Sequence, residues 1–241
     1  MNKYQNLFIT DGRFDGKSDF TKIRLALMYS LIDPKNTRYI LSWIRQLRKG
    51  IPLDLEKNTD PWITYRAIRY LDKVITKDSR IFEYGSGGSS LYFALRAKSI
   101  VSIEHNKDWY KKITQTLKEY KVNNCQIKLV EGLLTKDIHN PYLSLTQSNF
   151  EFEKYVNSIG DYSDGHFDLV IVDGRSRVQC VKKSYKKVRS GGMILLDNSE
   201  RKDYLEAHVF LSSIGAKPIN MFGLVAGYAP PLSETTIWRI P

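Results

Sequence analysis

Ile81-Phe82-Glu83-Tyr84-Gly85-Ser86-Gly87-Gly88-Ser89-Ser90 is an apolar run that passes directly into a glycine-rich turn. Because glycine has no Cβ and tolerates positive φ, such a turn lets the backbone approach a ligand closely. A second apolar run, Val101-Ser102-Ile103-Glu104, ends in an acid 19 positions after Gly85. At a spacing of roughly 20 residues, a carboxylate ending the second strand can accept hydrogen bonds from ribose hydroxyls. Together the two features predict a βαβ unit that binds a nucleoside cofactor.

The glycine spacing by itself is a weak indicator of a cofactor site. The turn is not a G-x-G-x-x-G motif, since the position three after Gly87 is Ser90. Similar turns occur where a strand simply needs a tight exit into a helix. The cofactor interpretation therefore depends on Glu104 as much as on the glycines.

Length and composition are those of a globular protein. The chain has 241 residues, enough for one domain or one domain with an appendage, and 42% of them are hydrophobic. It contains no run of about 18 apolar residues, and the amino terminus lacks the apolar core of a signal peptide. We therefore expect a soluble, cytoplasmic protein without a transmembrane segment. Cys125 and Cys180 have neither metal-ligand spacing nor a disulfide framework, so both are expected to be buried thiols.

A formal net charge of +11 favours acidic partners. Nucleic acid, anionic polysaccharide and a membrane surface all remain open on this ground. The densest basic stretch has helical spacing between two predicted strands, which favours a solvated helix face. Its members are Lys182, Lys183, Lys186, Lys187 and Arg189.

Two regions are expected, with a boundary near residue 60. Residues 1–60 form a predicted leader and helical cap: residues 1–20 are irregular, and helical periodicity follows at 22–32 and 39–47. A third helix is expected to start near Pro61, capped by Thr59 or Asp60, and to run to Ile75. Residues 61–241 form the predicted main domain.

From residue 80 onward, strand and helix patterns alternate, which is typical of a parallel sheet covered on both faces. The predicted strands are residues 80–84, 99–104, 125–131, 167–173 and 193–197, and the predicted helices are 89–98, 109–120, 178–188 and 204–214. Residues 133–166 are an insert with a possible short helix at 155–159. The last two strands, 217–222 and 235–240, have no crossover helix between them and must be antiparallel neighbours.

From about residue 60 to residue 241 the chain resembles the class I S-adenosylmethionine-dependent methyltransferases. The resemblance rests on the glycine turn, on Glu104, on Phe167-Asp168-Leu169-Val170-Ile171-Val172-Asp173-Gly174, on Ser190-Gly191-Gly192-Met193-Ile194-Leu195-Leu196-Asp197 and on the antiparallel terminus. It implies an α/β, Rossmann-like, doubly wound and mostly parallel seven-stranded sheet with an antiparallel C-terminal strand, preceded by N-terminal helices. It also implies S-adenosylmethionine as cofactor. The strings at 61–65, 101–105 and 172–177 resemble a bacterial subgroup of unassigned substrate.

The resemblance also implies which residues contact the cofactor. The methionine part is expected beside the turn, and Glu104 is expected to hold the ribose. The residues after the third strand, with His105 or Trp109, are expected to frame the adenine, and Asp173 is also expected to contact the cofactor. The full set of expected cofactor residues is Glu83, Gly85, Ser86, Gly87, Glu104, His105, Glu131, Gly132 and Asp173.

Asp173, Asp197 and Asn198 end the fourth and fifth strands and resemble the metal ligands of catechol-type O-methyltransferases. Three oxygen donors suit Mg²⁺ or another hard divalent cation, which would orient a hydroxyl and lower its pKa. Those enzymes have a lysine three residues after the first aspartate, whereas this chain has Ser176 between two arginines. Equally, these polar residues could serve only as a strand-end turn and a helix cap.

Without a metal, Asp173 is the candidate base, and Arg175 with Arg177 would hold an anionic acceptor. Asp173 and Arg175 are therefore the predicted catalytic residues. Trp43, Trp62 and Trp109 lie at helical spacing and are expected to pack in the core.

The leading functional prediction is an O-methyltransferase acting on a small molecule or a glycan. An RNA methyltransferase is the first alternative because of the positive charge, although the chain has no recognisable RNA-binding module and no Asn-Pro-Pro-Tyr signature. A nicotinamide oxidoreductase and a non-catalytic, methyltransferase-like binding module are further alternatives. The N-terminal helices are expected to act as a lid or as an interface for self-association.

Overall fold

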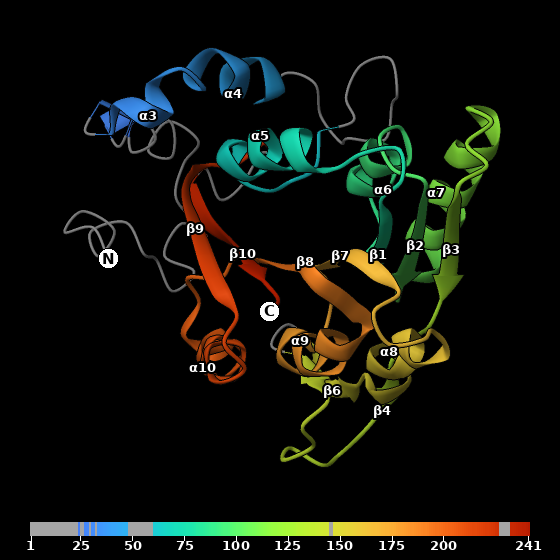
Figure 1. Ribbon diagram of the computed structural model, residues 1–241. Helices are drawn as coiled ribbons and strands as arrows, with labels where there is room; N and C mark the ends of the chain where they lie inside the picture. The colour runs from blue at the N-terminus through green and yellow to red at the C-terminus, as the bar shows by residue number, and fades with distance from the viewer. Residues whose placement is uncertain are drawn as a thin grey trace.

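The computed structural model describes residues 24, 27–28, 30–31, 33–47, 60–144, 147–226 and 232–241. Its centre is a seven-stranded sheet in the order β3-β2-β1-β7-β8-β10-β9, with helices on both sides (Figure 1). β10 runs antiparallel to both of its neighbours, while the pairs from β3 to β8 are parallel. The predicted α/β, Rossmann-like sheet with an antiparallel C-terminal strand is therefore confirmed. The strands are β1 Arg80–Tyr84, β2 Ser99–Glu104, β3 Cys125–Leu129, β7 Phe167–Val172, β8 Val188–Asp197, β9 Lys217–Leu224 and β10 Leu232–Arg239.

Helices cover the sheet in two layers. On one face lie α5 Tyr65–Val74, α6 Gly88–Ala94 and α7 Lys107–Glu119, with α3 Pro34–Thr37 and α4 Ile40–Leu47 beyond α5. On the other lie α8 Glu153–Asn157, α9 Arg177–Ser184 and α10 Leu205–Ser213, and the short 3-10 helices are η1 Ser158–Asp161, η2 Tyr185–Lys187 and η3 Lys202–Tyr204. No helix of the described residues is both long and apolar enough to cross a membrane.

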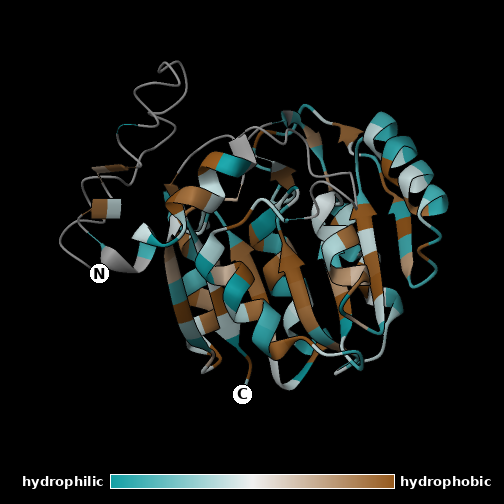
Figure 2. Ribbon diagram, turned by 90° about the horizontal axis from the view of Figure 1, so that it is seen from above, coloured by the Kyte–Doolittle hydropathy of each residue, from teal (hydrophilic) through white to brown (hydrophobic). Residues whose placement is uncertain are grey.

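The strands are apolar on both faces because both faces are covered. In β7, Leu169 and Ile171 pack under α5 and α6, while Val170 and Val172 pack toward α8 and α9. All four side chains are at most 2% exposed. Viewed from above, the strands are apolar along most of their length, and polar residues gather on the outer surfaces of the helices (Figure 2). The near-continuous apolar runs of the sequence thus reflect burial on two sides.

The described part of the N-terminal region shares the core of the sheet. Tyr39 stacks on Tyr65 with ring centroids 5.5 Å apart, and Trp43 is 1% exposed within the same cluster. The expected irregular segment at 1–20 lies outside the described residues, as does most of the expected helix at 22–32. A division at residue 60 stays a prediction.

The third helix begins later than predicted. α5 starts at Tyr65, and Thr64 is its N-cap, with its side chain accepting a hydrogen bond from the Ala67 amide. The reason is a tertiary contact: Thr64 forms an isolated bridge with Val225, and the Ala226 amide donates to the Ile63 carbonyl. The residues after Pro61 are thus held against the end of β9 instead of starting a helix.

The insert contains a second sheet that the sequence analysis missed. β4 Leu133–Leu134, β5 Leu143–Ser144 and β6 Gln147–Glu151 pair antiparallel in the order β4-β6-β5. Two of these strands have only two residues, too few to show an alternating pattern. β8 also starts earlier than expected, at Val188, because Gly191 and Gly192 continue the strand. Cys180 is buried as predicted, whereas Cys125 is only half-buried.

A buried carboxyl group lies under the glycine turn. Glu83 of β1 is 0% exposed, and its Oε2 accepts hydrogen bonds from the Ser90 and Ser102 hydroxyls at 2.6 and 2.5 Å. These bonds tie β1 to α6 and to β2. Burial raises the pKa of Glu83 to about 7, although the serine hydroxyls oppose the shift.

Replacing Glu83 should change how stability depends on pH. Since its folded pKa lies above its ordinary value of 4.5, Glu83 stabilises the fold below pH 4.5, and this contribution is lost as the pH rises through about 7. The full loss corresponds to about 3 kcal/mol. Urea unfolding of Glu83→Gln between pH 5 and 8 should therefore show a flatter pH profile than the wild type. Glu131→Gln, which alters an exposed glutamate, is the control. Parallel profiles for wild type and Glu83→Gln would contradict the buried acid.

Candidate functional site

A cavity of about 590 Å³ opens at the carboxyl ends of β1, β2 and β7. The chain leaves β1 toward β2 on one side, and β7 lies on the other, so this is the point where the strand order reverses. Open α/β sheets bind ligands at this place. The lining residues are Trp62, Gly85, Ser86, Gly87, Gly88, Ser89, Glu104, His105, Asn106, Asp108, Trp109, Lys112, Asp173, Gly174, Arg175 and Arg177.

Two glycines of the turn have different roles. Gly85 has φ +99°, and a Cβ there would lie 3.1 Å from the backbone of Gly174, so Gly85 is needed for the turn and for the contact between two loops. Gly87 has extended backbone, and a Cβ there would meet no heavy atom closer than 3.9 Å. No protein atom crowds Gly87. The missing side chain instead leaves its backbone open to the cavity.

Glu104 is held rigidly at the cavity wall. Its Oε2 accepts from the Ser86 amide and hydroxyl at 3.1 and 2.8 Å, and its Oε1 accepts from the amides of His105 and Asn106 at 2.9 and 2.7 Å. Burial alone would raise the pKa of Glu104, but hydrogen bonds from His105, Asn106 and Ser86 outweigh it and lower the pKa. Glu104 is therefore a preorganised carboxylate.

The start of α7 forms the wall next to Glu104. The Asn106 side chain caps this helix by accepting from the amides of Asp108 and Trp109. The indole Nε1 of Trp109 donates to the Ser86 carbonyl at 2.8 Å, which joins α7 to the glycine turn. Trp109 is half-buried against the cluster of Leu91, Ile113 and Leu117 and also lines the cavity, whereas Trp62 lines the cavity and is 42% exposed, so the expected packing role is wrong for Trp62 only.

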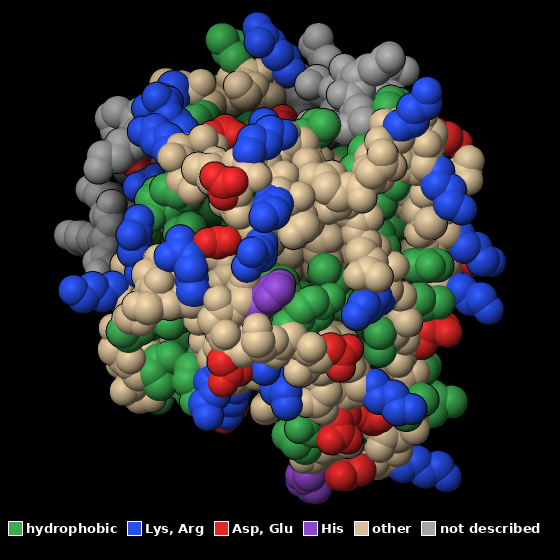
Figure 3. All heavy atoms as spheres, turned by 45° about the vertical axis from the view of Figure 1, so that its right-hand side comes forward, with side chains coloured by type: hydrophobic (Ala, Val, Ile, Leu, Met, Phe, Trp, Pro, Cys, Tyr) green, Lys and Arg blue, Asp and Glu red, His purple; other side chains and the backbone are tan. Residues whose placement is uncertain are grey.

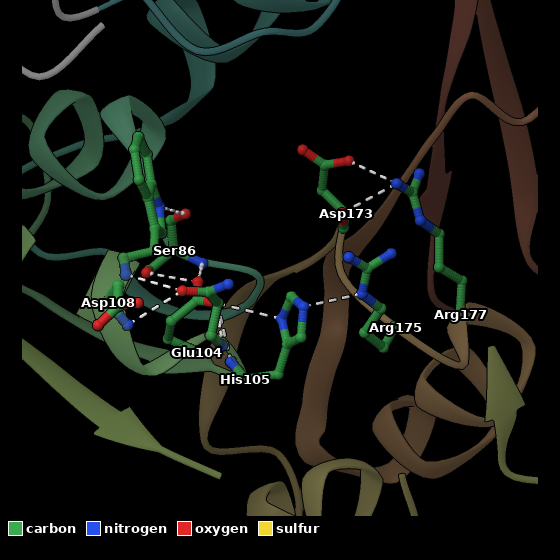
Figure 4. Close-up of polar contacts among 9 residues, drawn as sticks. Ser86, Glu104, His105, Asp108, Asp173, Arg175 and Arg177 are labelled. Atoms are coloured by element: carbon green, nitrogen blue, oxygen red, sulfur yellow. Dashed lines mark hydrogen bonds and ion pairs between the residues drawn. The ribbon is translucent and has the colours of Figure 1, made fainter. Parts of the chain in front are cut away.

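His105 connects the second strand to the loop after β7. Arg175 Nε donates to His105 Nε2 at 2.9 Å, and His105 Nδ1 lies 3.0 Å from Glu104 Oε1 (Figure 4). Because Nε2 must accept from the arginine, the ring proton is on Nδ1 and faces Glu104. The structure thus brings together Glu104, His105 and Arg175. The sequence analysis placed Glu104 and His105 together beside the cofactor, but it did not predict their contact with Arg175.

Arg177 joins the ends of β7 and β8. Its guanidinium contacts the Asp173 carboxylate at 2.8 Å, and it donates to the carbonyls of Asp173, Gly174 and Asp197 and to Asn198 Oδ1. These contacts use every part of the guanidinium fork. Figure 4 shows the Arg177 guanidinium turned toward Asp173. Only 10% of the Arg177 side chain is exposed, whereas 34% of the Asp173 side chain is exposed.

The residues expected to bind a metal do not fit one. Asp197 is 2% exposed, and its Oδ1 accepts from the Thr235 hydroxyl at 2.7 Å. Asp173 and Asn198 both contact Arg177, so a guanidinium already provides the positive charge between the two strand ends, and a divalent cation would be repelled there. Among the described residues, no group of three or more His, Cys, Asp or Glu side chains could hold a metal ion. Asp197 and Asn198 do not cap the following helix either, because the N-cap of η3 is Arg201.

Three expected cofactor residues lie outside the cavity lining. Glu83 is buried under the turn, Glu131 is exposed, and Gly132 packs against Phe152, whose ring would be 2.8 Å from a Cβ at that position. The side chains at that end of the cavity come instead from Asp108 and Lys112 of α7. Sequence reasoning missed these two, although their positions one turn apart on the helix after Glu104 are a usable signal.

No protein family model and no curated protein matches the sequence. Solved structures do resemble it. A precorrin-6y C5,15-methyltransferase from Geobacter metallireducens GS-15 is 15% identical with a TM-score of 0.52, over 76% of this chain and 92% of that one. A putative rRNA-methylase from Clostridium thermocellum is 12% identical with a TM-score of 0.50, over 73% and 94%. With the strand order and the antiparallel β10, these likenesses show that the chain has the fold of the class I S-adenosylmethionine-dependent methyltransferases.

Proposed function

We propose that the chain is an S-adenosylmethionine-dependent methyltransferase whose acceptor is a hydroxyl group of a small molecule or a glycan. The observation that carries this proposal is the pairing of two carboxylates across one cavity. Glu104 stands beside the open glycine turn, and Asp173 stands on the loop after β7. The first suits a ribose, and the second suits an acceptor that must lose a proton.

The geometry of Glu104 supports a specific mode of ribose binding. A carboxylate has about four lone-pair sites, and four hydrogen bonds already fill them here, beside the His105 Nδ1 that lies 3.0 Å from Oε1. Three of these donors are backbone amides, which cannot turn away. The Ser86 hydroxyl can rotate, so we infer that a ribose hydroxyl takes its place on Oε2.

The protein's task in the reaction is alignment and removal of one proton. S-adenosylmethionine, when bound, supplies an electrophilic methyl group on a sulfonium that leaves as a neutral thioether. The acceptor oxygen forms the new bond to carbon as the carbon–sulfur bond breaks, and the Asp173 carboxylate takes the hydroxyl proton. Arg177 fixes the rotamer of Asp173 through the 2.8 Å ion pair, while Arg175 faces the acceptor side of the cavity. Positioning of this kind contributes roughly 7–11 kcal/mol in favourable models.

We also infer a division of the chain at residue 60, with an N-terminal cap before the methyltransferase domain. The contacts of Tyr39 and Trp43 with the core support a cap that packs over α5 and β9.

Replacing Glu104 should weaken cofactor binding. Glu104→Ala removes the charged acceptor for the ribose, so calorimetry with S-adenosylhomocysteine should show a dissociation constant about tenfold to hundredfold higher than that of the wild type. Glu119→Ala, at the exposed end of α7, is the matched control and should bind like the wild type. Unchanged affinity in Glu104→Ala would mean that another residue holds the ribose. Absence of binding by the folded wild type would remove the cofactor from the proposal.

Divalent cations should not bind at Asp173. Since the Arg177 guanidinium is already paired with this carboxylate, Mg²⁺ or Mn²⁺ should shift the melting temperature of the S-adenosylhomocysteine complex no more than NaCl of equal ionic strength does. A specific Mn²⁺ shift that disappears in Asp197→Asn would contradict this expectation and restore the metal hypothesis.

The second candidate is RNA, which the charge of +11 favours. The distribution of charge counts against it. In the basic stretch around α9, Lys182 pairs with Glu206, Lys187 with Asp164 and Arg189 with Asp168. Figure 3 shows Lys and Arg spread over one face of the molecule and interspersed with Asp and Glu, with no continuous basic track.

Filter binding of structured RNA across a salt series separates the two candidates. A small-molecule enzyme should retain little RNA at physiological salt. Each phosphate neutralised in an RNA complex would add about −0.7 to the slope of log affinity against log salt. Tight binding with a slope corresponding to several phosphates would favour RNA as the substrate.

A further inference from the structure

A second cavity, of about 290 Å³, adjoins the first on the far side of Arg175 and Arg177. The two cavities share Gly174, Arg175 and Arg177, so an acceptor whose hydroxyl lies beside Asp173 would be next to the second cavity. We propose that this second cavity binds a tetrahedral oxyanion, the phosphate or sulfate ester group of the methyl acceptor. The proposal rests on the proposed function, because it assigns the substrate class of the same site.

The arginines of the second cavity differ in their pairing. The charge of Arg177 is matched by Asp173. Arg201, which lies on the loop between β8 and η3, is half-buried, and its side chain makes no hydrogen bond or ion pair within the described residues. Asp203 and Glu206 also line the cavity, but Asp203 is exposed and Glu206 is paired with Lys182. The charge of Arg201 acts on Asp173, which is already in an ion pair with Arg177, so a positive charge remains for a ligand to match.

The first turn of α9 adds neutral donors at the same place. This helix has eight residues, and the amides of Arg177, Val178 and Gln179 have no partner among the residues that the structure describes. Its N-cap, Ser176, makes no capping hydrogen bond. The helix dipole and unpaired amides of such a terminus favour an anion.

Ser176 points independently to a ligand. It is 7% exposed, and its Oγ has no hydrogen-bond partner within the described residues, although a buried hydroxyl without a partner is costly. Its φ of +45° is left-handed, a conformation that serine adopts rarely. Strain of this kind persists where surrounding structure or function requires it. A ligand oxygen in the cavity would satisfy the hydroxyl.

The number of donors favours a tetrahedral group over a carboxylate. A carboxylate is planar, and one arginine fork satisfies both of its oxygens. Here a guanidinium comes from the loop between β8 and η3, a hydroxyl from the loop after β7, and amides from the first turn of α9. Three or four oxygens directed apart, as in a phosphate or a sulfate, match such a set better.

The test uses the full chain saturated with S-adenosylhomocysteine. Inorganic phosphate, inorganic sulfate or acetate is added at constant ionic strength, and the melting temperature is measured. Phosphate or sulfate should give a saturable rise, and the stronger of the two identifies the ester. In Arg201→Gln the half-saturating concentration should rise about tenfold or more, since a charge-assisted hydrogen bond is lost. Lys202→Gln, which removes the same charge from the exposed neighbouring position, should stay within about twofold of the wild type.

Ser176→Gly provides a second variant that separates binding from folding. Glycine adopts the left-handed conformation freely, so the unliganded protein should melt no lower than the wild type, while oxyanion affinity falls several-fold. The proposal is overturned if neither oxyanion gives a saturable effect, if acetate binds equally well, or if Arg201→Gln behaves like the wild type. Failure of the wild type to bind S-adenosylhomocysteine would instead overturn the proposed function, and the oxyanion titrations would still report on the cavity.

Discussion

The close approach of the β1 and β7 loops is the constraint on which the rest of the site depends. A Cβ on Gly85 would lie 3.1 Å from Gly174, and a Cβ on Gly174 would lie 2.0 Å from the Tyr155 hydroxyl and 3.0 Å from the backbone of Tyr84. Only two glycines allow this contact. It places the turn beside Glu104 and the loop that holds Asp173 and Arg175 on one cavity. The turn and Glu104 on one side of the cavity, and Asp173 and Arg175 on the other, are therefore positioned by a single backbone contact.

Arg177 gives the Asp173 side of the cavity its particular character. Its guanidinium holds the ends of β7 and β8 together by charge and hydrogen bonds, as a bound metal cation could also do. It differs in chemistry, since a guanidinium has no open coordination position for a substrate oxygen. In the reaction that we propose, the catalytic task therefore falls on Asp173 and on alignment.

The two sides of the cavity are also connected electrostatically. His105 lies between Glu104, the expected ribose ligand, and Arg175, which faces both cavities. The groups that we propose for cofactor binding and for acceptor binding are thus linked through His105. The excess positive charge elsewhere is partly matched by surface acids, so the specific charges are those inside the cavities.

The amino-acid pattern alone was sufficient for the sheet and for placing the glycine turn and Glu104 on one cavity, because burial on both faces forces apolar runs and because ligand sites follow the carboxyl ends of parallel strands. It was insufficient where contacts join distant residues. Asp197 bonds Thr235, 38 residues later, and Arg175 bonds His105, 70 residues earlier, and such pairs leave no local periodicity. The late start of α5, the exposure of Trp62 and the second cavity likewise result from contacts between residues that are far apart in the sequence. The pairing of Asp173 with an arginine emerged only from the tertiary structure, because β7 and β8 lie side by side and Arg177 reaches the ends of both.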